Sequence, residues 1–320
     1  MLTLGPCVHA IVYPWLSGTT FLPKALAARL GHQQWIHIPL SQNTSRPLTC
    51  TRTFPSTDGI ALNPAIFLPG LSMSPANPPE AMQYWESVLS LCEGSTQIYP
   101  ADEGGRDVFA LGNVIVKSSH LHGTQEIDYS FADANEVKAI PVARKVLRDI
   151  RVPEIYFAGK IRGRQVLIQE RLPGVALNVA WPYLSQLQKK SFKEQARAIL
   201  QQLHTIMPHD GRQARFHVVS DPNILCNGRI NPLEGEILFA DANHDADLSF
   251  MHNDFTQSNC IVDRDRIVGL VDWEMAGFFC WKTAGEVHRR IRTPQREHFV
   301  NASLSEDRLQ DIMFWNDLYD

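Results

Sequence analysis

Between residues 79 and 93 the apolar positions fall at helical spacing. Ala81, Trp85, Val88, Leu89 and Cys92 recur along one face, which predicts an amphipathic helix. The residues before it show no such period, because short apolar runs alternate there with polar and Pro-rich pieces. That pattern fits an irregular extension packed on the next domain and, equally, a partly disordered segment.

Several short apolar runs then predict a small antiparallel sheet. The first three are Thr96–Tyr99, Arg106–Leu111 and Val114–Lys117, with Gly104-Gly105 and Gly112-Asn113 as turn signals. Two further strands are expected at Ile155–Ala158 and Gln165–Gln169. A helical stretch separates the two groups. It starts near Glu136, is closed by Val152-Pro153, and contains Pro141, which should kink or restart it.

Helical periodicity dominates the chain after Gly174. Ser185 is expected to cap a long helix that ends at Pro208, with one apolar stripe formed by Phe192, Ala196, Ile199, Leu200 and Leu203. Residues 209 to 250 look rich in loops, and a last helix is predicted from about Ser305. The whole pattern indicates an α+β protein with a small sheet-containing part followed by a mainly helical part.

Composition and charge narrow the class of protein. The chain has 320 residues, of which 44% are hydrophobic and 20% charged, as in ordinary globular proteins. The formal net charge of −4 and the lack of a dense Lys/Arg cluster give no reason to expect nucleic-acid binding, so small-molecule partners are favoured. The oligomeric state stays open.

The cysteines and the N-terminal residues indicate the cellular compartment that we expect for the protein. The six cysteines are scattered without Cys-x-x-Cys spacing, which suggests neither a zinc site nor a disulfide framework, and we expect reduced thiols in a cytoplasmic protein. The first twenty residues lack a basic start, and Pro14 and Ser17–Thr20 interrupt their apolar run. We therefore expect no signal peptide and no membrane span.

The candidate chemistry gathers around a predicted hairpin. Cys260–Val262 and Ile267–Val271 are two apolar runs joined by the charged turn Asp263-Arg264-Asp265-Arg266. Asp254 and Asn259 precede the hairpin and Asp272 follows it, so a loop and a hairpin could bring two carboxylates and an amide together. Phosphoryl transfer needs such a set: a carboxylate to accept the proton of the attacking hydroxyl, and hard oxygen ligands for Mg²⁺.

The motif itself resembles a known family. His252-Asn253-Asp254-Phe255, Asn259 and Val271-Asp272-Trp273-Glu274 are similar to the catalytic segment of the aminoglycoside phosphotransferase and choline kinase-like family. Protein kinases would carry Arg after the His and end in Asp-Phe-Gly, and neither feature is present. The resemblance implies a bilobal protein-kinase-like fold. We assign residues 1–92 to an N-terminal extension, 93–172 to a nucleotide-binding lobe and 173–320 to a catalytic and acceptor-binding lobe.

The resemblance also implies roles for individual residues. The expected reaction is transfer of the γ-phosphoryl group of ATP to a hydroxyl of a small molecule, with Mg²⁺ as the second cofactor. Asp254 would be the catalytic base, Asn259 and Asp272 would bind the metal, and Glu274 would be a further metal or substrate ligand. His252, which follows an apolar pair, is expected to hold the loop rather than to titrate.

Two more pairs of residues are expected to form the nucleotide site. Lys117 ends an apolar strand, where the resembled family places the lysine that contacts the phosphates, and Glu136 would fix its ammonium. A competing interpretation is that Asp133-x-x-Glu136 is a capping box at a helix start. Glu170 and Leu172 lie at the expected interlobe hinge, where the carbonyl of the first and the N–H of the second would meet adenine.

Other positions leave alternatives open. The phosphate-covering loop, Tyr99–Gly105, has two glycines but also Asp102 and Glu103, which would repel phosphate. The acidic run Asp241, Asp245 and Asp247 is a solvated face or, with Glu274, Trp281 and Glu286, a pocket for a cationic acceptor. The alternative to an active kinase is a catalytically silent nucleotide-binding or scaffold protein with the same fold.

Overall fold

The computed structural model describes residues 79–98, 106–119, 128–208, 214–239 and 247–320. All of these belong to one compact unit. The N-terminal extension before residue 79, the loop at 99–105 and residues Asp241 and Asp245 of the acidic run lie outside the described residues. The division of the chain at residues 92 and 172 stays a prediction.

A four-stranded antiparallel sheet forms the first part of the described chain. Its strands are β1 (Asp107–Leu111), β2 (Val114–Ser118), β3 (Ile155–Ile161) and β4 (Arg164–Glu170), in the order β1-β2-β4-β3. Helix α2 (Pro79–Leu89) packs on it through Trp85, whose ring stacks on Tyr156 with centroids 6.4 Å apart. The predicted amphipathic helix and four of the five predicted strands are thereby confirmed.

The remaining strand, predicted at Thr96–Tyr99, is present in its described part as a single antiparallel bridge from Gln97 to Phe109 of β1. The Ile98 N–H donates to the Val108 carbonyl and the Ala110 N–H donates to the Thr96 carbonyl, both at 2.9 Å. The prediction is confirmed for this bridge alone, because the N–H groups of Thr96 and Gln97 are bound to the Glu93 carbonyl in a tight turn, at 2.9 and 3.1 Å.

Helix α3 (Ser130–Ala143) follows β2 in the chain and contacts β3. It begins six positions before Glu136 and ends two residues after Pro141, instead of restarting beyond it as the sequence suggested. Pro141 is accommodated in the last turn of α3, and after Ala143 the Lys145 and Val146 N–H groups bond to carbonyls three residues back instead of four, so the chain leaves the helix in a turn. The predicted continuation to Val152-Pro153 is therefore wrong.

The second part of the chain combines helices with two three-stranded sheets. The helices are α4 (Leu177–Ala180), α5 (Gln186–His204), α6 (Pro232–Phe239), α7 (Trp281–Val287) and α8 (Glu306–Ile312), with short 3-10 turns at Trp181–Tyr183, Gln257–Asn259 (η3), Trp273–Met275 (η4) and Arg296–Phe299, and a π-helical turn at His288–Arg292 (η5). The sheets are β6-β10-β7, from Phe216–His217, Gly277–Cys280 and Leu248–Met251, and β5-β8-β9, from Val175–Ala176, Cys260–Asp263 and Arg266–Leu270.

The helix boundaries confirm some sequence signals and correct others. Ser185 caps α5 in a capping box with Gln188, as expected, although the helix ends at His204, before Pro208. Residues 209 to 250 are less loop-rich than predicted, since α6 lies there. This helix starts at Pro232, where the Asn231 side chain accepts the N–H of Leu233 at 2.9 Å.

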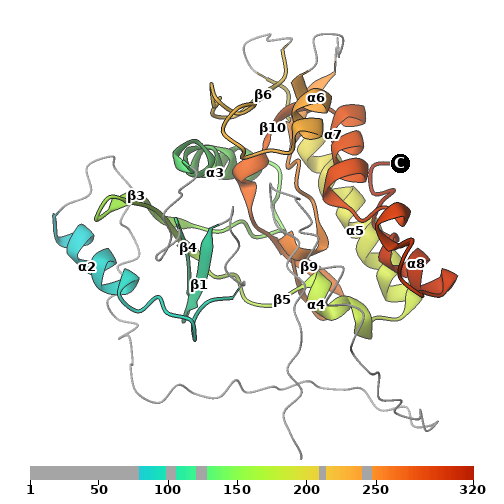
Figure 1. The fold of residues 1–320 in the computed structure, drawn as a ribbon, viewed down its shortest axis with the longest axis horizontal. Coiled ribbons are helices and arrows are strands. Elements are labelled where there is room, and N and C mark those ends of the chain that lie inside the picture. The colour runs from blue at the N-terminus through green and yellow to red at the C-terminus, as the bar shows by residue number, and fades with distance from the viewer. Residues whose placement is uncertain (1–78, 99–105, 120–127, 209–213, 240–246) are drawn as a thin grey trace, which may run out of the picture. The chain divides into compact units, whose positions relative to one another are not determined.

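One hydrophobic core joins the two parts. Ala139 and Ile140 of α3 belong to the same buried cluster as Leu200 of α5 and Phe250 of β7. In Figure 1 the four-stranded sheet lies on one side of α3 and the helices α5, α7 and α8 on the other. The α+β architecture predicted from the sequence, with a small antiparallel-sheet lobe and a mainly helical lobe, is confirmed.

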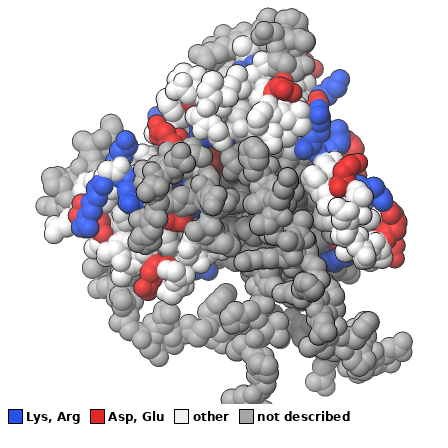
Figure 2. Space-filling model, in the orientation of Figure 1, with Lys and Arg blue, Asp and Glu red and all other residues white. Residues whose placement is uncertain are grey.

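Charges of both signs lie side by side on the surface. Figure 2 shows Lys and Arg next to Asp and Glu on the visible face, and exposed pairs such as Arg289–Asp320, at 2.7 Å, connect them. None of the helices in the described ranges is long and apolar enough to span a membrane.

His288 makes the fold sensitive to acid. Burial lowers its pKa to about 4, from a usual value of 6.5, and its Nε2 donates to the Trp315 carbonyl at 2.9 Å. The unfolded chain binds a proton here below pH 6.5 and the folded chain does not, so stability falls as the pH falls from 6.5 towards 4.

The variant His288→Gln keeps a hydrogen-bond donor and removes the titration. It should reduce the loss of unfolding free energy between about pH 7.5 and pH 5 by about 2 kcal/mol, since each pH unit contributes about 1.4 kcal/mol. Urea titrations at both pH values measure this difference. Equal losses in variant and wild type would contradict the prediction.

Candidate active site

The predicted catalytic loop runs from the end of β7 to the start of β8. Strand β7 delivers Met251, and residues 252–256 then turn into η3, which ends at Asn259. Asn253 has the left-handed φ of 61°, and Asp272, after β9, has φ 67°. The hairpin ladder extends past Cys260 and Leu270, because the Val271 N–H donates to the Asn259 carbonyl at 3.0 Å. The two ends of the hairpin therefore place Asn259 beside Asp272.

His252 holds this loop, as the sequence suggested. Its Nε2 donates to the Val271 carbonyl at 3.0 Å, and its Nδ1 accepts the Asp254 N–H at 3.2 Å. Burial lowers its pKa to about 4, so the ring stays neutral at ordinary pH. One imidazole thus joins the catalytic loop to the end of β9.

Asp254 is buried and held at both carboxylate oxygens. Asn259 Nδ2 donates to Oδ2 at 3.0 Å and to the Asp254 carbonyl at 2.8 Å. Arg292 Nε lies 3.2 Å from Oδ1. Burial raises the pKa of Asp254 to about 7, and the Arg292 charge opposes that rise. The carboxylate is consequently oriented and close to its titration point near neutral pH.

Lys117 lies between two carboxylates from different elements. Its Nζ contacts Glu136 Oε2 at 2.8 Å and Asp272 Oδ1 at 2.7 Å. Burial by itself would lower the pKa of Lys117, but Asp272 and Glu136 outweigh it and raise that pKa. Burial raises the pKa of Glu136 against the opposing Lys117 charge, whereas for Asp272 the effect of burial is outweighed by Lys117, which lowers its pKa.

These contacts decide between the two interpretations of Glu136. Helix α3 begins at Ser130, with no side-chain cap at Tyr129, and both Asp133 and Glu136 are buried within it. The capping-box hypothesis is therefore wrong, and the ion pair with Lys117 is what the structure contains. Asp133 instead contacts Arg106 Nη1 at 2.7 Å.

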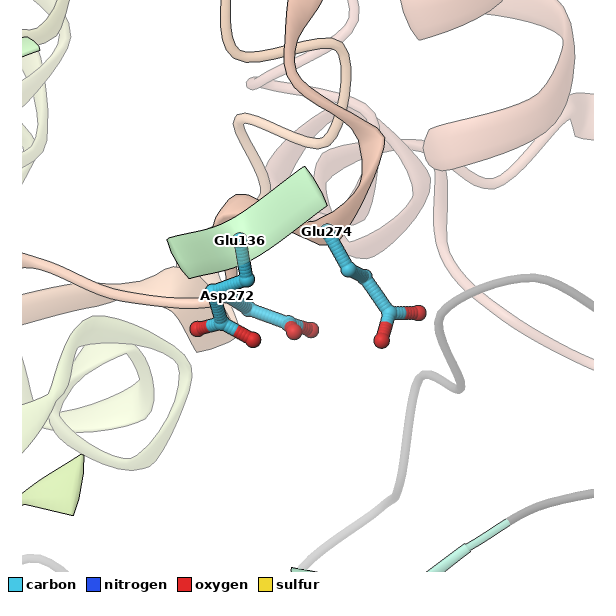
Figure 3. Close-up of side chains that lie close together, drawn as sticks. All are labelled: Glu136, Asp272 and Glu274. Carbon is cyan, nitrogen blue, oxygen red and sulfur yellow. The ribbon is translucent and has the colours of Figure 1, made fainter. Parts of the chain in front are cut away.

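A cluster of three carboxylates lies beside Lys117. One oxygen each from Glu136, Asp272 and Glu274 lies within 4.8 Å of the others. Figure 3 shows the three side chains, one from α3 and two from the chain around η4, with their carboxylates pointing to the same side. Arg106 Nη1 approaches Glu274 at 3.6 Å. Burial, and then Asp272, raises the pKa of Glu274.

Asn135 joins α3 by hydrogen bonds to the backbone that carries Asp272 and Glu274. Its Nδ2 donates to the carbonyls of Glu274 and Ala276, at 2.9 and 2.8 Å. Its Oδ1 accepts the Val219 N–H at 2.7 Å. A single buried amide thus sets the position of η4, and with it Asp272 and Glu274, relative to Glu136 on the same helix.

The hinge candidates lie where β4 leaves the sheet. The Glu170 side chain pairs with Arg151, and the backbone N–H of Glu170 donates to the Glu154 carbonyl at 2.8 Å. Leu172 is buried against Gly269 of β9. The segment therefore passes from the sheet to the catalytic hairpin, while contact of its backbone with adenine stays a prediction.

The residues suggested for binding a cationic acceptor lie in different parts of the structure. Trp281 donates from Nε1 to the Tyr319 carbonyl at 2.7 Å and packs on His204, so its role is structural packing. Glu286 pairs with Arg290 at 2.8 Å on the surface. Asp247 is exposed. Of the suggested residues that the structure describes, Glu274 alone lies in the carboxylate cluster.

Four residues that the sequence analysis missed complete the site: Arg106, Asn135, Glu234 and Arg292. Arg292 Nη2 binds Glu234, and both side chains are buried. A usable signal existed for Glu234, an acid among the apolar residues Leu233, Ile237 and Leu238 of its helix. Arg292 is joined to Asp254 by the tertiary fold alone, and no local pattern marks it.

Comparison with protein families supports the resemblance seen in the motif. Residues 134–278 match the model of the phosphotransferase enzyme family (APH). The match covers somewhat less than half of the chain and includes most of α3, the catalytic loop and the hairpin. The predicted resemblance to aminoglycoside phosphotransferases is confirmed over this segment. No curated protein matches the sequence.

Solved structures with partial similarity include three antibiotic phosphotransferases. APH(2'')-IIa, in a ternary complex with streptomycin and ATP, is 14% identical over 67% of this chain and 75% of its own, with a TM-score of 0.42. APH(3'')-Id from Streptomyces rimosus is 16% identical over 74% and 98%, with a TM-score of 0.39. The macrolide 2'-phosphotransferase MphH from Brachybacterium faecium is 13% identical over 75% and 83%, with a TM-score of 0.40.

Replacing Asn135 tests how far the site depends on α3. Asn135→Ala should lower the free energy of unfolding by about 3 kcal/mol, because buried carbonyl and N–H groups lose their partners. Asn316→Ala is a matched control, since that amide makes one bond, to the Pro294 carbonyl at 2.8 Å, and should cost about 1 kcal/mol. Urea unfolding measures both, and equal losses would contradict the special position of Asn135.

Proposed function

We propose that the chain transfers the γ-phosphoryl group of ATP to a hydroxyl of a small molecule. The observation that carries this proposal is the convergence of Lys117 of β2, Asp272 after β9, and Asp254 and Asn259 of the catalytic loop onto one site. In the reaction the hydroxyl gives its proton to Asp254, its oxygen bonds to the γ-phosphorus, and the bond to the bridging oxygen breaks to release ADP.

The environment of Asp254 suits a general base. A base works best when its pKa lies near the operating pH, and burial raises the pKa of Asp254 to about 7. Both oxygens are oriented before any acceptor arrives. The group is therefore positioned and has the proton affinity to take a hydroxyl proton.

Lys117 suits a phosphate contact. An ammonium has three N–H donors, and Glu136 and Asp272 occupy two of them. Among the described residues no acceptor is recorded for the third, which would contact a phosphate oxygen. Glu170 and Leu172 are proposed to meet the adenine through their backbone groups at the hinge.

The carboxylate cluster fits a divalent cation. Glu136 Oε1 is buried and has no hydrogen-bond partner among the described residues, and carboxylate and amide oxygens are the ligands that Mg²⁺ prefers. Asp272, Glu274 and Asn259, whose Nδ2 faces Asp254 and whose amide oxygen therefore faces away, would hold Mg²⁺. The metal would supply neutralisation of charge on the phosphates.

For the acceptor we propose a hydroxylated small molecule, with a cationic one favoured by the buried carboxylates of the site. Aminoglycosides, choline and other hydroxylated amines are the candidates. The alternative, a silent nucleotide-binding protein, is distinguished by thermal shift with ATP and Mg²⁺ followed by a phosphate-transfer assay over these amines. Binding without transfer to any acceptor, or to water, would favour the silent protein.

Removing the base tests the chemical step. Asp254→Asn should lower kcat by about 10²- to 10⁴-fold, because the amide cannot accept the proton, while ATP affinity stays unchanged. Asp263→Asn, at the exposed last residue of β8, is the control and should keep the wild-type rate. A rate near that of wild type in Asp254→Asn would remove the assignment.

Removing the metal ligand tests the cofactor. Asp272→Ala should abolish Mg²⁺-dependent ATP binding, since the variant loses a ligand and also leaves Lys117 with one partner. Calorimetric titration of ATP with and without Mg²⁺ measures the effect. An affinity that still rises with Mg²⁺ as in the wild type would exclude Asp272 as a metal ligand.

A further inference from the structure

Arg292 touches the catalytic loop at two points. Its Nε donates to the Asn253 carbonyl at 3.1 Å and lies 3.2 Å from the Asp254 carboxylate. Its Nη2 binds Glu234 of α6. One planar guanidinium thus contacts the peptide before the catalytic residue, the catalytic side chain and a separate helix.

The backbone conformation of the catalytic loop shows why the contact of Arg292 with Asn253 matters. Asn253 has a φ of 61°, a left-handed conformation that non-glycine residues adopt at an energetic cost. The Arg292 bond to the Asn253 carbonyl, together with the Asn253 Nδ2 bond to the Met275 carbonyl at 3.2 Å, holds that peptide in place. The direction of the Asp254 side chain depends on the orientation of this peptide.

Burial makes the arrangement rigid. The side chains of Arg292, Glu234 and Asp254 expose 4%, 0% and 4% of their surfaces. A buried ion pair adds little net stability over apolar packing of the same volume, but loss of one partner leaves the other charge buried and unpaired. The guanidinium fork is also preorganised in a way that an ammonium is not.

We propose that Arg292, anchored by Glu234, is the positioning residue that orients the Asp254 carboxylate for phosphoryl transfer, an inference that rests on the proposed function. Asn259 holds one carboxylate oxygen and Arg292 the other. Each oxygen of the proposed base is thereby held by a different side chain, and Arg292 acts through Asp254.

Kinetics of the full chain with Mg²⁺·ATP test this role, with water as the acceptor and ATP hydrolysis as the readout. Arg292→Gln should lower kcat by about 10²-fold, the size of effect expected from a misplaced catalytic group, with the Kd for Mg²⁺·ATP within about threefold of wild type. Arg292→Lys, which restores the charge but not the fork, should recover about a tenth of the wild-type rate.

Two further variants separate positioning from folding. In Glu234→Gln/Arg292→Gln the buried charges are removed as a pair, so this variant should fold and show the same loss of kcat. Arg229→Lys alters another buried ion pair, Arg229–Asp221 at 3.1 Å, and should keep the wild-type kcat.

The outcomes distinguish the two proposals. A double variant that folds and hydrolyses ATP at the wild-type rate would overturn the role of Arg292, as would a loss of kcat matched by an equal loss of ATP affinity. Asp254→Asn is measured alongside. If it hydrolyses ATP as fast as wild type, the proposed function itself fails; if it is slow while Arg292→Gln is not, only the positioning role fails.

Discussion

Buried negative charge is the constraint around which this site is built. Among the described residues, three buried cations each contact two carboxylates: Arg106 contacts Asp133 and Glu274, Lys117 contacts Glu136 and Asp272, and Arg292 contacts Glu234 and Asp254. In each trio one carboxylate belongs to a helix of the scaffold and the other to the catalytic loop or the segment after β9. Each cation therefore ties a reactive carboxylate to a rigid element.

The arrangement leaves the site short of positive charge. Each trio carries one more negative than positive group, and burying uncompensated charge is costly. Burial raises the pKa of Glu136, Glu274 and Asp254, and the negative charge of Asp272 adds to the rise of each. A divalent cation and a cationic acceptor are the partners that would relieve it, and this charge balance links the geometry of the site to the proposed reaction.

Helix α3 connects the hydrophobic core to the site. Within one turn it presents Asp133, Asn135 and Glu136, all buried, to Arg106, the backbone around η4, and Lys117. Its apolar face, with Ala139 and Ile140, packs into the core shared with α5 and β7. Movement of the sheet relative to the catalytic loop is consequently opposed by polar bonds and by packing on the same helix.

The sequence by itself determined the local elements and the local part of the site. Hydrophobic periodicity predicted α2, α5, the hairpin β8–β9 and most of the small sheet, and the spacing of Asp254, Asn259 and Asp272 predicted their convergence, because a loop and a hairpin suffice to bring them together. Only the tertiary structure decided that Glu136 pairs with Lys117 rather than capping a helix, and that Arg106, Glu234 and Arg292 belong to the site. Those residues meet through the packing of elements far apart in the chain, and a buried ion pair between distant segments leaves no periodic signal in either.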